Sequence, residues 1–180
     1  MAGNPTLFTA TQWLLRAAML VCAFGAVILC LCLGGLVLVG TEMWVPKEIP
    51  AVLDGVPRAH VLMIVFLAVT AGLAMLGLAL LVFQAIHQIV ESAIGGDPFI
   101  VSNADRLARV GWLLVGIYGV QLLMNGVMTA IVPKQLEGHF QFDLGNDLSP
   151  QTIIAILLVF VLAQIFRHGA QMRAELEGTV

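Results

Sequence analysis

A row of four polar side chains lies within an otherwise apolar part of this chain. The members are Tyr118, Gln121, Asn125 and Thr129, and their spacing places them on one face of a helix. Polar groups inside a membrane turn towards neighbouring helices or a water-filled path, because lipid offers them no hydrogen bonds. The row is therefore either a path for a solute or ion, or a set of interhelical hydrogen bonds. We favour hydrogen bonding, because the surrounding stretch lacks the carboxylate that an ion carrier usually keeps in mid-membrane.

The histidines suggest a second chemistry. Paired histidines on a helical bundle can ligate haem iron through their ring nitrogens. His87 and His168 are expected near one membrane face, and His60 and His139 near the other. None lies deep in an apolar stretch, so a bis-histidine haem b protein is a remote alternative. Zinc-ligand spacing, phosphate-binding loops and nucleophile elbows do not occur in the sequence. We therefore expect no enzyme, no cofactor and no metal site.

Four long apolar stretches must position these residues. They cover residues 17–41, 59–90, 110–133 and 148–166, and each is free of Lys, Arg, Asp and Glu and long enough to cross a hydrocarbon core of about 30 Å as a helix. The stretches are uniformly apolar rather than alternating, which favours helices over a barrel. They predict an all-α integral membrane protein, a four-transmembrane-helix bundle that forms a single domain over residues 1–180. The expected spans are approximately residues 15–40, 60–88, 108–132 and 150–168.

The composition excludes several classes of function. The chain is 60% hydrophobic and 11% charged, whereas soluble proteins average about 25% charged residues. Outside the spans only short loops and tails remain, too short for a soluble catalytic domain of about 50 residues or more. A net charge of −3 argues against direct binding of nucleic acid, which calls for a clustered basic face.

The basic residues predict the orientation of the chain. One side of the membrane receives five Lys or Arg residues near the span ends and the other receives three. The five are Arg16, Arg106, Arg109, Arg167 and Arg173, and the three are Lys47, Arg58 and Lys134. Because basic residues favour the cytoplasmic side, both termini and the central loop are expected in the cytoplasm. The chain is expected in the bacterial cytoplasmic (inner) membrane, in contact with the lipid bilayer.

Two local patterns predict further packing. Apolar and polar residues alternate over residues 140–144, which predicts a short strand and a small extracytoplasmic hairpin. Small residues recur at every fourth position of the first span, which predicts close approach of another helix. These small residues are Ala18, Cys22, Ala26, Cys30 and Gly34.

The central loop has clear stop and start signals. Gly95 and Gly96 end the second helix, and Asp97-Pro98 prevents its resumption. Ser102 and Asp105 fit a capping box that starts the next helix. Phe99 is expected to fold back onto the bundle, and the arginines that follow are expected to snorkel at the interface.

The fourth helix also begins with a recognisable signal. Ser149 can cap it and Pro150 takes the first helical position. Its pattern continues past the apolar stretch towards Glu177, so we expect a helix that projects into the cytoplasm.

Two segments, residues 96–109 and 166–177, are expected to form one cytoplasmic surface. Their charges are mixed, which favours specific docking of a protein over general attraction to anionic lipid. The alternative is that their arginines only anchor the helices at the interface. The candidate docking residues are Asp97, Phe99, Arg106, Arg109, Arg167, Arg173 and Glu175.

The pattern Gly-Asp-Pro-Phe at residues 96–99, followed by Asn103, Arg106-Leu107 and Gly111-Trp112, resembles a known signature. It is that of domain of unknown function 2975, a family of small bacterial membrane proteins. Residues 156–180 are similar to the C-terminal pattern of that family. The resemblance implies a four-span bundle without assigned activity or catalytic residues. Members are often encoded beside a small helix-turn-helix repressor of the Cro/CI type, which implies such a regulator as a partner.

These observations predict a non-enzymatic, regulatory membrane protein whose cytoplasmic face engages a partner such as a helix-turn-helix repressor. The competing interpretation is a small transporter or channel subunit that uses the polar row of the third span. Self-association into a homo-oligomer is compatible with both.

Overall fold

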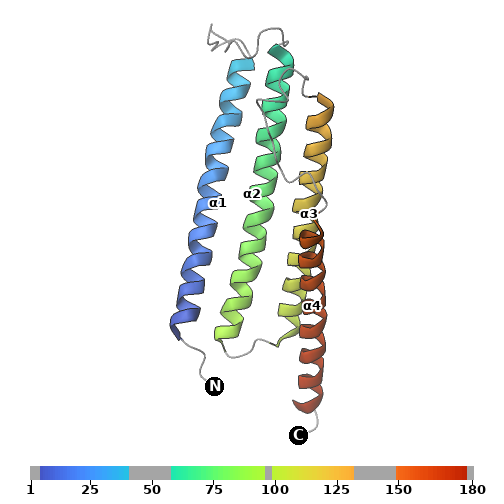
Figure 1. Ribbon diagram of the computed structural model, residues 1–180. Helices are drawn as coiled ribbons and strands as arrows, with labels where there is room; N and C mark the ends of the chain where they lie inside the picture. The colour runs from blue at the N-terminus through green and yellow to red at the C-terminus, as the bar shows by residue number, and fades with distance from the viewer. Residues whose placement is uncertain (1–4, 41–57, 96–98, 132–148, 178–180) are drawn as a thin grey trace.

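The computed structural model describes residues 5–40, 58–95, 99–131 and 149–177, which form four long helices (Figure 1). The helices are α1 (Pro5–Gly40), α2 (Arg58–Ile94), α3 (Val101–Ile131) and α4 (Pro150–Glu177). All four are long and apolar enough to cross a membrane. The expected all-α fold with four candidate spans is therefore confirmed, and the chain is a multi-pass membrane protein in contact with lipid.

The helices pack as an open row in the order of the sequence. Within the described residues α2 lies between α1 and α3, α4 packs on α3, and α1 comes close to α2 alone. Figure 1 shows α1 at one edge of the row, with both chain termini at the same end. We call this the termini end; it holds the starts of α1 and α3 and the ends of α2 and α4. Lipid tails are as apolar as the side chains, so no hydrophobic force closes the row into a ring.

Two glycines let α1 and α2 approach closely. A Cβ atom on Gly25 would lie 3.3 Å from Cδ1 of Leu76, and one on Gly72 would lie 3.1 Å from Cδ1 of Leu29. Each helix thus places a leucine over a glycine of the other. Small residues at such positions are the usual means by which membrane helices gain van der Waals contact.

The small residues at every fourth position of α1 were predicted to face another helix, and only part of this stripe does so. Cys30 is exposed, and no atom of the described residues lies within 4 Å of where a Cβ on Gly34 would be. A step of four residues overshoots a full helical turn by about 40°. A stripe with that strict spacing therefore rotates away from the neighbour, whereas Gly25 and Leu29 stay on the contact face.

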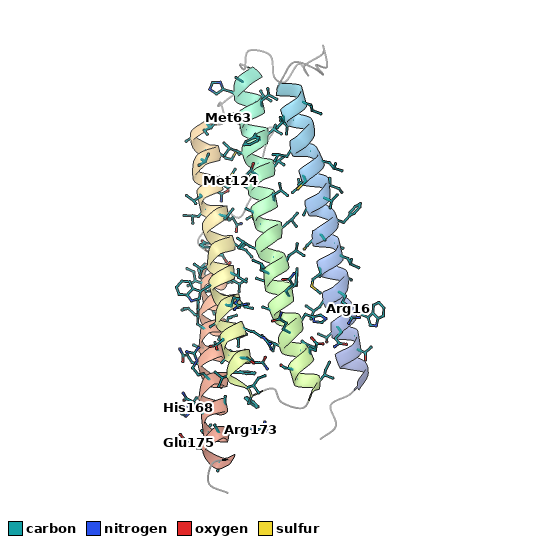
Figure 2. The ribbon with its side chains drawn as sticks, turned by 180° about the vertical axis from the view of Figure 1, so that it is seen from behind. Arg16, Met63, Met124, His168, Arg173 and Glu175 are labelled. Carbon is teal, nitrogen blue, oxygen red and sulfur yellow. The ribbon has the colours of Figure 1, made fainter. Side chains whose placement is uncertain are left out.

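Two small apolar clusters join α2 to α3. Ile64 packs with Met124 and Met128 far from the termini end. Val82 and Ala85 pack with Val110 nearer to it. Figure 2 shows Met124 at the end of the molecule opposite His168 and Arg173. Many other large apolar side chains of the described residues are exposed, as expected for a surface that faces lipid.

The contact of α3 with α4 is built on Gly111. A Cβ atom there would lie 2.9 Å from ring carbons of Phe160. The same ring meets the indole of Trp112 edge to face, with centroids 5.5 Å apart. In Figure 1, α4 is displaced towards the termini end, so that its last turns project past the ends of the other helices.

The helix ends partly follow the sequence signals. At the start of α4, the Ser149 carbonyl accepts hydrogen bonds from the amides of Thr152 and Ile153, and the helix continues to Glu177 as predicted. α3 already begins at Val101, so Ser102 lies in its first turn rather than at the cap. The predicted strand at residues 140–144 lies outside the described residues.

Candidate functional site

A fully buried asparagine organises the termini end. Asn103 is the most buried polar residue of the described chain, and its Nδ2 donates to Ser92 Oγ at 2.5 Å. Ser92 in turn donates to the Ile89 carbonyl at 2.8 Å. The bond between the two side chains joins the last turn of α2 to the first turn of α3. It fixes the corner from which the rest of the termini end is built.

The Arg106 side chain bonds groups of α2 and α3 at this corner and does not extend to the membrane interface. Its Nη1 donates to Asn103 Oδ1 at 2.9 Å and to the Gln88 carbonyl at 3.4 Å. The second contact places a positive charge near the negative end of the α2 dipole, which is favourable. The expected snorkelling of Arg106 is therefore replaced by internal hydrogen bonding, because a partner across the helix pair lies within reach.

A second set of contacts joins α3 to α4. Arg167 Nη2 lies 2.7 Å from Asp105 Oδ1 in a charge-assisted hydrogen bond. Asp105 thus pairs with α4 instead of acting in the predicted capping box. Phe99, just before α3, lies against Phe166 with ring centroids 5.1 Å apart. A Cβ atom on Gly169 would lie 3.2 Å from Cδ1 of Phe99, so the ring rests on that glycine.

The predicted joining of the two segments is therefore found in the structure. The start of α3 and the end of α4 form one continuous area, which we call the composite surface: residues 99–109 and 166–177. Phe99 does fold back, as expected, onto α4. Ion pairing and ring contact together fix the position of α4 relative to α3.

The remaining candidate docking residues lie at the edge of this surface. Arg109, Arg173 and Glu175 are exposed, and Asp97 lies outside the described residues. Figure 2 shows Arg173 and Glu175 on the projecting last turns of α4. Met172 and Leu176 on the same turns are exposed at 50% and 72%. These turns combine both charge signs with apolar side chains that the described residues leave uncovered.

Neither Asn103 nor Ser92 was expected to have a role in this surface. The available signal was an asparagine three residues before Arg106, a spacing that places both on one helix face. It is weak, because the partner of Asn103 comes from another helix.

The polar row of α3 divides in two. Thr129 is exposed, and its Oγ1 donates to the carbonyls of Asn125 and Gly126 at 2.9 and 3.0 Å, so its own helix satisfies it. Tyr118, Gln121 and Asn125 are half-buried. The Tyr118 hydroxyl is buried and has no hydrogen-bond partner among the described residues. The four side chains therefore do not form a continuous polar path along α3.

Replacing Gln121 and Asn125 together with leucine is expected to lower the free energy of unfolding by about 1–2 kcal/mol, at roughly 0.6 kcal/mol per intramembrane hydrogen bond. Denaturation by SDS in mixed micelles measures this change. Thr129→Val is the control, expected to cost less because the hydroxyl bonds only its own helix. A double variant as stable as wild type that loses a solute flux would support the transport interpretation instead.

Two of the histidines weighed for the remote haem alternative lie on helices that do not pack on each other. His87 lies on α2 with Nδ1 3.9 Å from Glu91 Oε2, whereas His168 is exposed on α4. α3 packs between these two helices. In the residues that are described, no group of three His, Cys, Asp or Glu side chains is arranged to hold a metal ion.

A family model described as a protein of unknown function (DUF2975) matches residues 59–180. That range covers α2 from its second residue, α3, α4 and the whole composite surface. No match was found among curated proteins, and none among solved structures.

Proposed function

The chain belongs to the DUF2975 family of proteins of unknown function, and from that premise we propose that it is a non-enzymatic interaction protein. Its composite surface docks a soluble protein on the cytoplasmic side of a bacterial inner membrane. A small helix-turn-helix repressor, held at the membrane by this contact, is the partner we propose.

One observation carries the proposal: the composite surface is fixed from two sides. The Arg167–Asp105 pair and the Phe99–Phe166 contact hold α4 against the start of α3. The projecting turns of α4 consequently extend from a base that contacts between two helices hold in place. A preorganised surface loses less entropy when a partner binds than a mobile one does.

The distribution of basic and aromatic residues supports a cytoplasmic termini end. Arg16 and Arg109 are exposed at this end of α1 and α3, and Trp13 and Trp112 are exposed close to them in sequence. Exposed tryptophans beside arginines are typical of the membrane boundary, and the excess of arginine is typical of its cytoplasmic side. The composite surface then lies at and beyond the cytoplasmic boundary.

The chemistry of the projecting turns suits a protein partner. Arg173 and Glu175 offer both charge signs, which confer specificity and salt sensitivity. Leu176, further from the membrane, is an apolar side chain that a partner can cover. An anionic lipid surface, in contrast, would be met by an unbroken basic cluster.

Reversing Arg109 and Arg173 to glutamate is expected to reduce co-purification of the partner about fivefold or more at low salt, since rim charges mainly affect association and together contribute about 1 kcal/mol or more. Quantitative mass spectrometry of complexes from native membranes measures the loss. The matched control replaces both arginines with lysine, which keeps the charge and should keep the partner. Unchanged co-purification of every cytoplasmic protein with the glutamate variant, in correctly inserted protein, would contradict the proposal.

One observation favours a second candidate, a small transporter or channel subunit. The buried Tyr118 hydroxyl lies on the polar row and has no hydrogen-bond partner among the described residues. A polar solute bound on this row would supply the missing partner. A solute flux in proteoliposomes that Tyr118→Phe abolishes would favour this alternative over docking.

A further inference from the structure

An apolar groove runs along α4 beside the start of α3. It has a volume of about 590 Å³, and its lining is almost wholly apolar. Ile165, Gly169 and Met172 line it along α4, and Phe99 contributes from the segment before α3. Contacts with Phe166 and Gly169 hold the Phe99 ring in place. The groove is therefore a product of the way α3 packs on α4.

Much of the groove lies on the aqueous side of the membrane boundary. The exposed residues Arg109 and Trp112 mark that boundary on α3. Asp105, which pairs with Arg167, precedes Arg109 by one helical turn, and Met172 follows Arg167 by more than one turn. At about 1.5 Å per residue, these steps place Met172 roughly 13 Å beyond the level of Arg109. Acyl chains end near the boundary, so they do not reach this part of the groove.

The length and shape of the groove suit a helix. Ile165 and Met172 are two helical turns apart, a distance of about 10 Å. A helix lying alongside presents apolar side chains at positions i, i+3 or i+4, and i+7 over the same distance. The ridge that they form packs into a groove of a neighbouring helix. A volume of about 590 Å³ has room for several such side chains, since a cavity of about 150 Å³ already holds a benzene molecule.

The rim of the groove favours an acidic occupant. Because the lining is almost wholly apolar, His168 and Arg173 contribute mainly carbon atoms to it, and their polar ends lie at the rim. Figure 2 shows both residues on the last turns of α4. No Asp or Glu of the described residues lines the groove. A helix with acidic residues beside its apolar face therefore complements the charge of Arg173, whereas a basic helix is repelled by it.

A second copy of this chain does not complement the groove. A twofold contact brings identical patches together, so groove would face groove and Arg173 would face its counterpart. Neither hollow would be filled, and the like charges would repel each other. The occupant must instead present a convex apolar face.

We propose that the groove binds an acidic amphipathic helix of the soluble protein that docks on the composite surface. The apolar face of that helix fills the space between Ile165, Met172 and Phe99, and its acidic residues lie beside Arg173. The inference rests on the proposed function and adds to it the chemistry by which the partner is selected.

Cross-linking from within the groove tests the inference in intact cells. An apolar photo-cross-linking amino acid replaces Met172 in the full-length protein, and the cross-linked peptide is sequenced. We expect a peptide of a cytoplasmic protein with apolar residues at three- and four-residue spacing and with more Asp and Glu than Lys and Arg. An adduct with lipid, an adduct with a second copy, or a peptide without that pattern would overturn the inference.

Two variants of Met172 test whether the apolar lining is what binds the helix. The side chain is 50% exposed, so its replacement leaves the fold intact. Met172→Gln keeps the length of the side chain but makes its end polar, and it should reduce co-purification of the protein found by cross-linking about fivefold. Met172→Leu keeps the apolar character and should retain the protein. Equal co-purification with the two variants would contradict binding in the groove.

A second cross-linking position separates failure of this inference from failure of docking itself. Leu176 lies on the composite surface but does not line the groove. A protein adduct from Leu176 without one from Met172 would leave docking intact and overturn the inference about the groove. Absence of a protein adduct from both positions would contradict the proposed function and the inference together.

Discussion

Replacing Gly111 with leucine is expected to disrupt the contact of α4 with α3 and to lower the free energy of unfolding by about 1–3 kcal/mol, the usual cost of overpacking. Even a Cβ atom at this position would lie 2.9 Å from carbons of the Phe160 ring. The ring cannot easily retreat, because it also meets Trp112 edge to face. SDS denaturation in mixed micelles would measure the loss, and Trp112 fluorescence would report displacement of the ring.

The chain offers a closely matched control for this substitution. Gly119 and Gly126 lie on the same helix, and no atom in the described parts of the chain lies within 4 Å of where a Cβ atom would be on either. Leucine at these exposed positions should leave stability nearly unchanged, because the new side chain enters lipid. If Gly111→Leu were no more destabilising than Gly119→Leu, the described packing of α4 on α3 would be wrong.

Replacing Asn103 with alanine is expected to cost about 1–3 kcal/mol, because the half-buried side chains of Ser92 and Arg106 each lose one hydrogen-bond partner. Ser92 would lose the bond from Nδ2, and the Arg106 guanidinium would lose its acceptor at 2.9 Å. The corner between α2 and α3 should loosen, which faster hydrogen exchange at the start of α3 would show.

Ser102→Ala is the control for this second substitution. Ser102 is the preceding residue of the same helical turn, but its side chain is exposed, so its removal should be nearly neutral. Similar losses of unfolding free energy for the two variants would mean that the first turn of α3 is sensitive to any substitution. The hydrogen bonds of Asn103 would then not be the cause.

Local signals in the sequence predicted the elements well. Each helix contains a long run free of charges, and lipid leaves such a run little choice but a helix. The start of α4 at Ser149-Pro150 and its continuation to Glu177 were both predicted, although the Ser149 hydroxyl donates to Gln151 Oε1 instead of accepting from a backbone amide.

Contacts between helices were harder to predict, because they depend on partners distant in sequence. The spacing of Asp105 from Ser102 fits a capping box, yet Asp105 pairs with Arg167 on α4. No local pattern in the sequence indicates that pair. The small-residue stripe of α1 failed at Cys30 and Gly34 for a related reason, since its spacing drifts around the helix while the neighbour does not. The meeting of the two segments of the composite surface was predictable, since both lie at the same end of their helices. The bonds that hold them together were not.

The most direct test of the proposed function is to ask what the projecting end of α4 touches in the cell. A photo-cross-linking amino acid at Leu176 samples the composite surface, and one at Val37 samples the opposite end of α1 with similar exposure. We expect Leu176 to yield one defined adduct with a cytoplasmic protein, lost when Arg109 and Arg173 are reversed to glutamate. Absence of that adduct in intact cells, or the same adduct from Val37, would contradict docking at this surface.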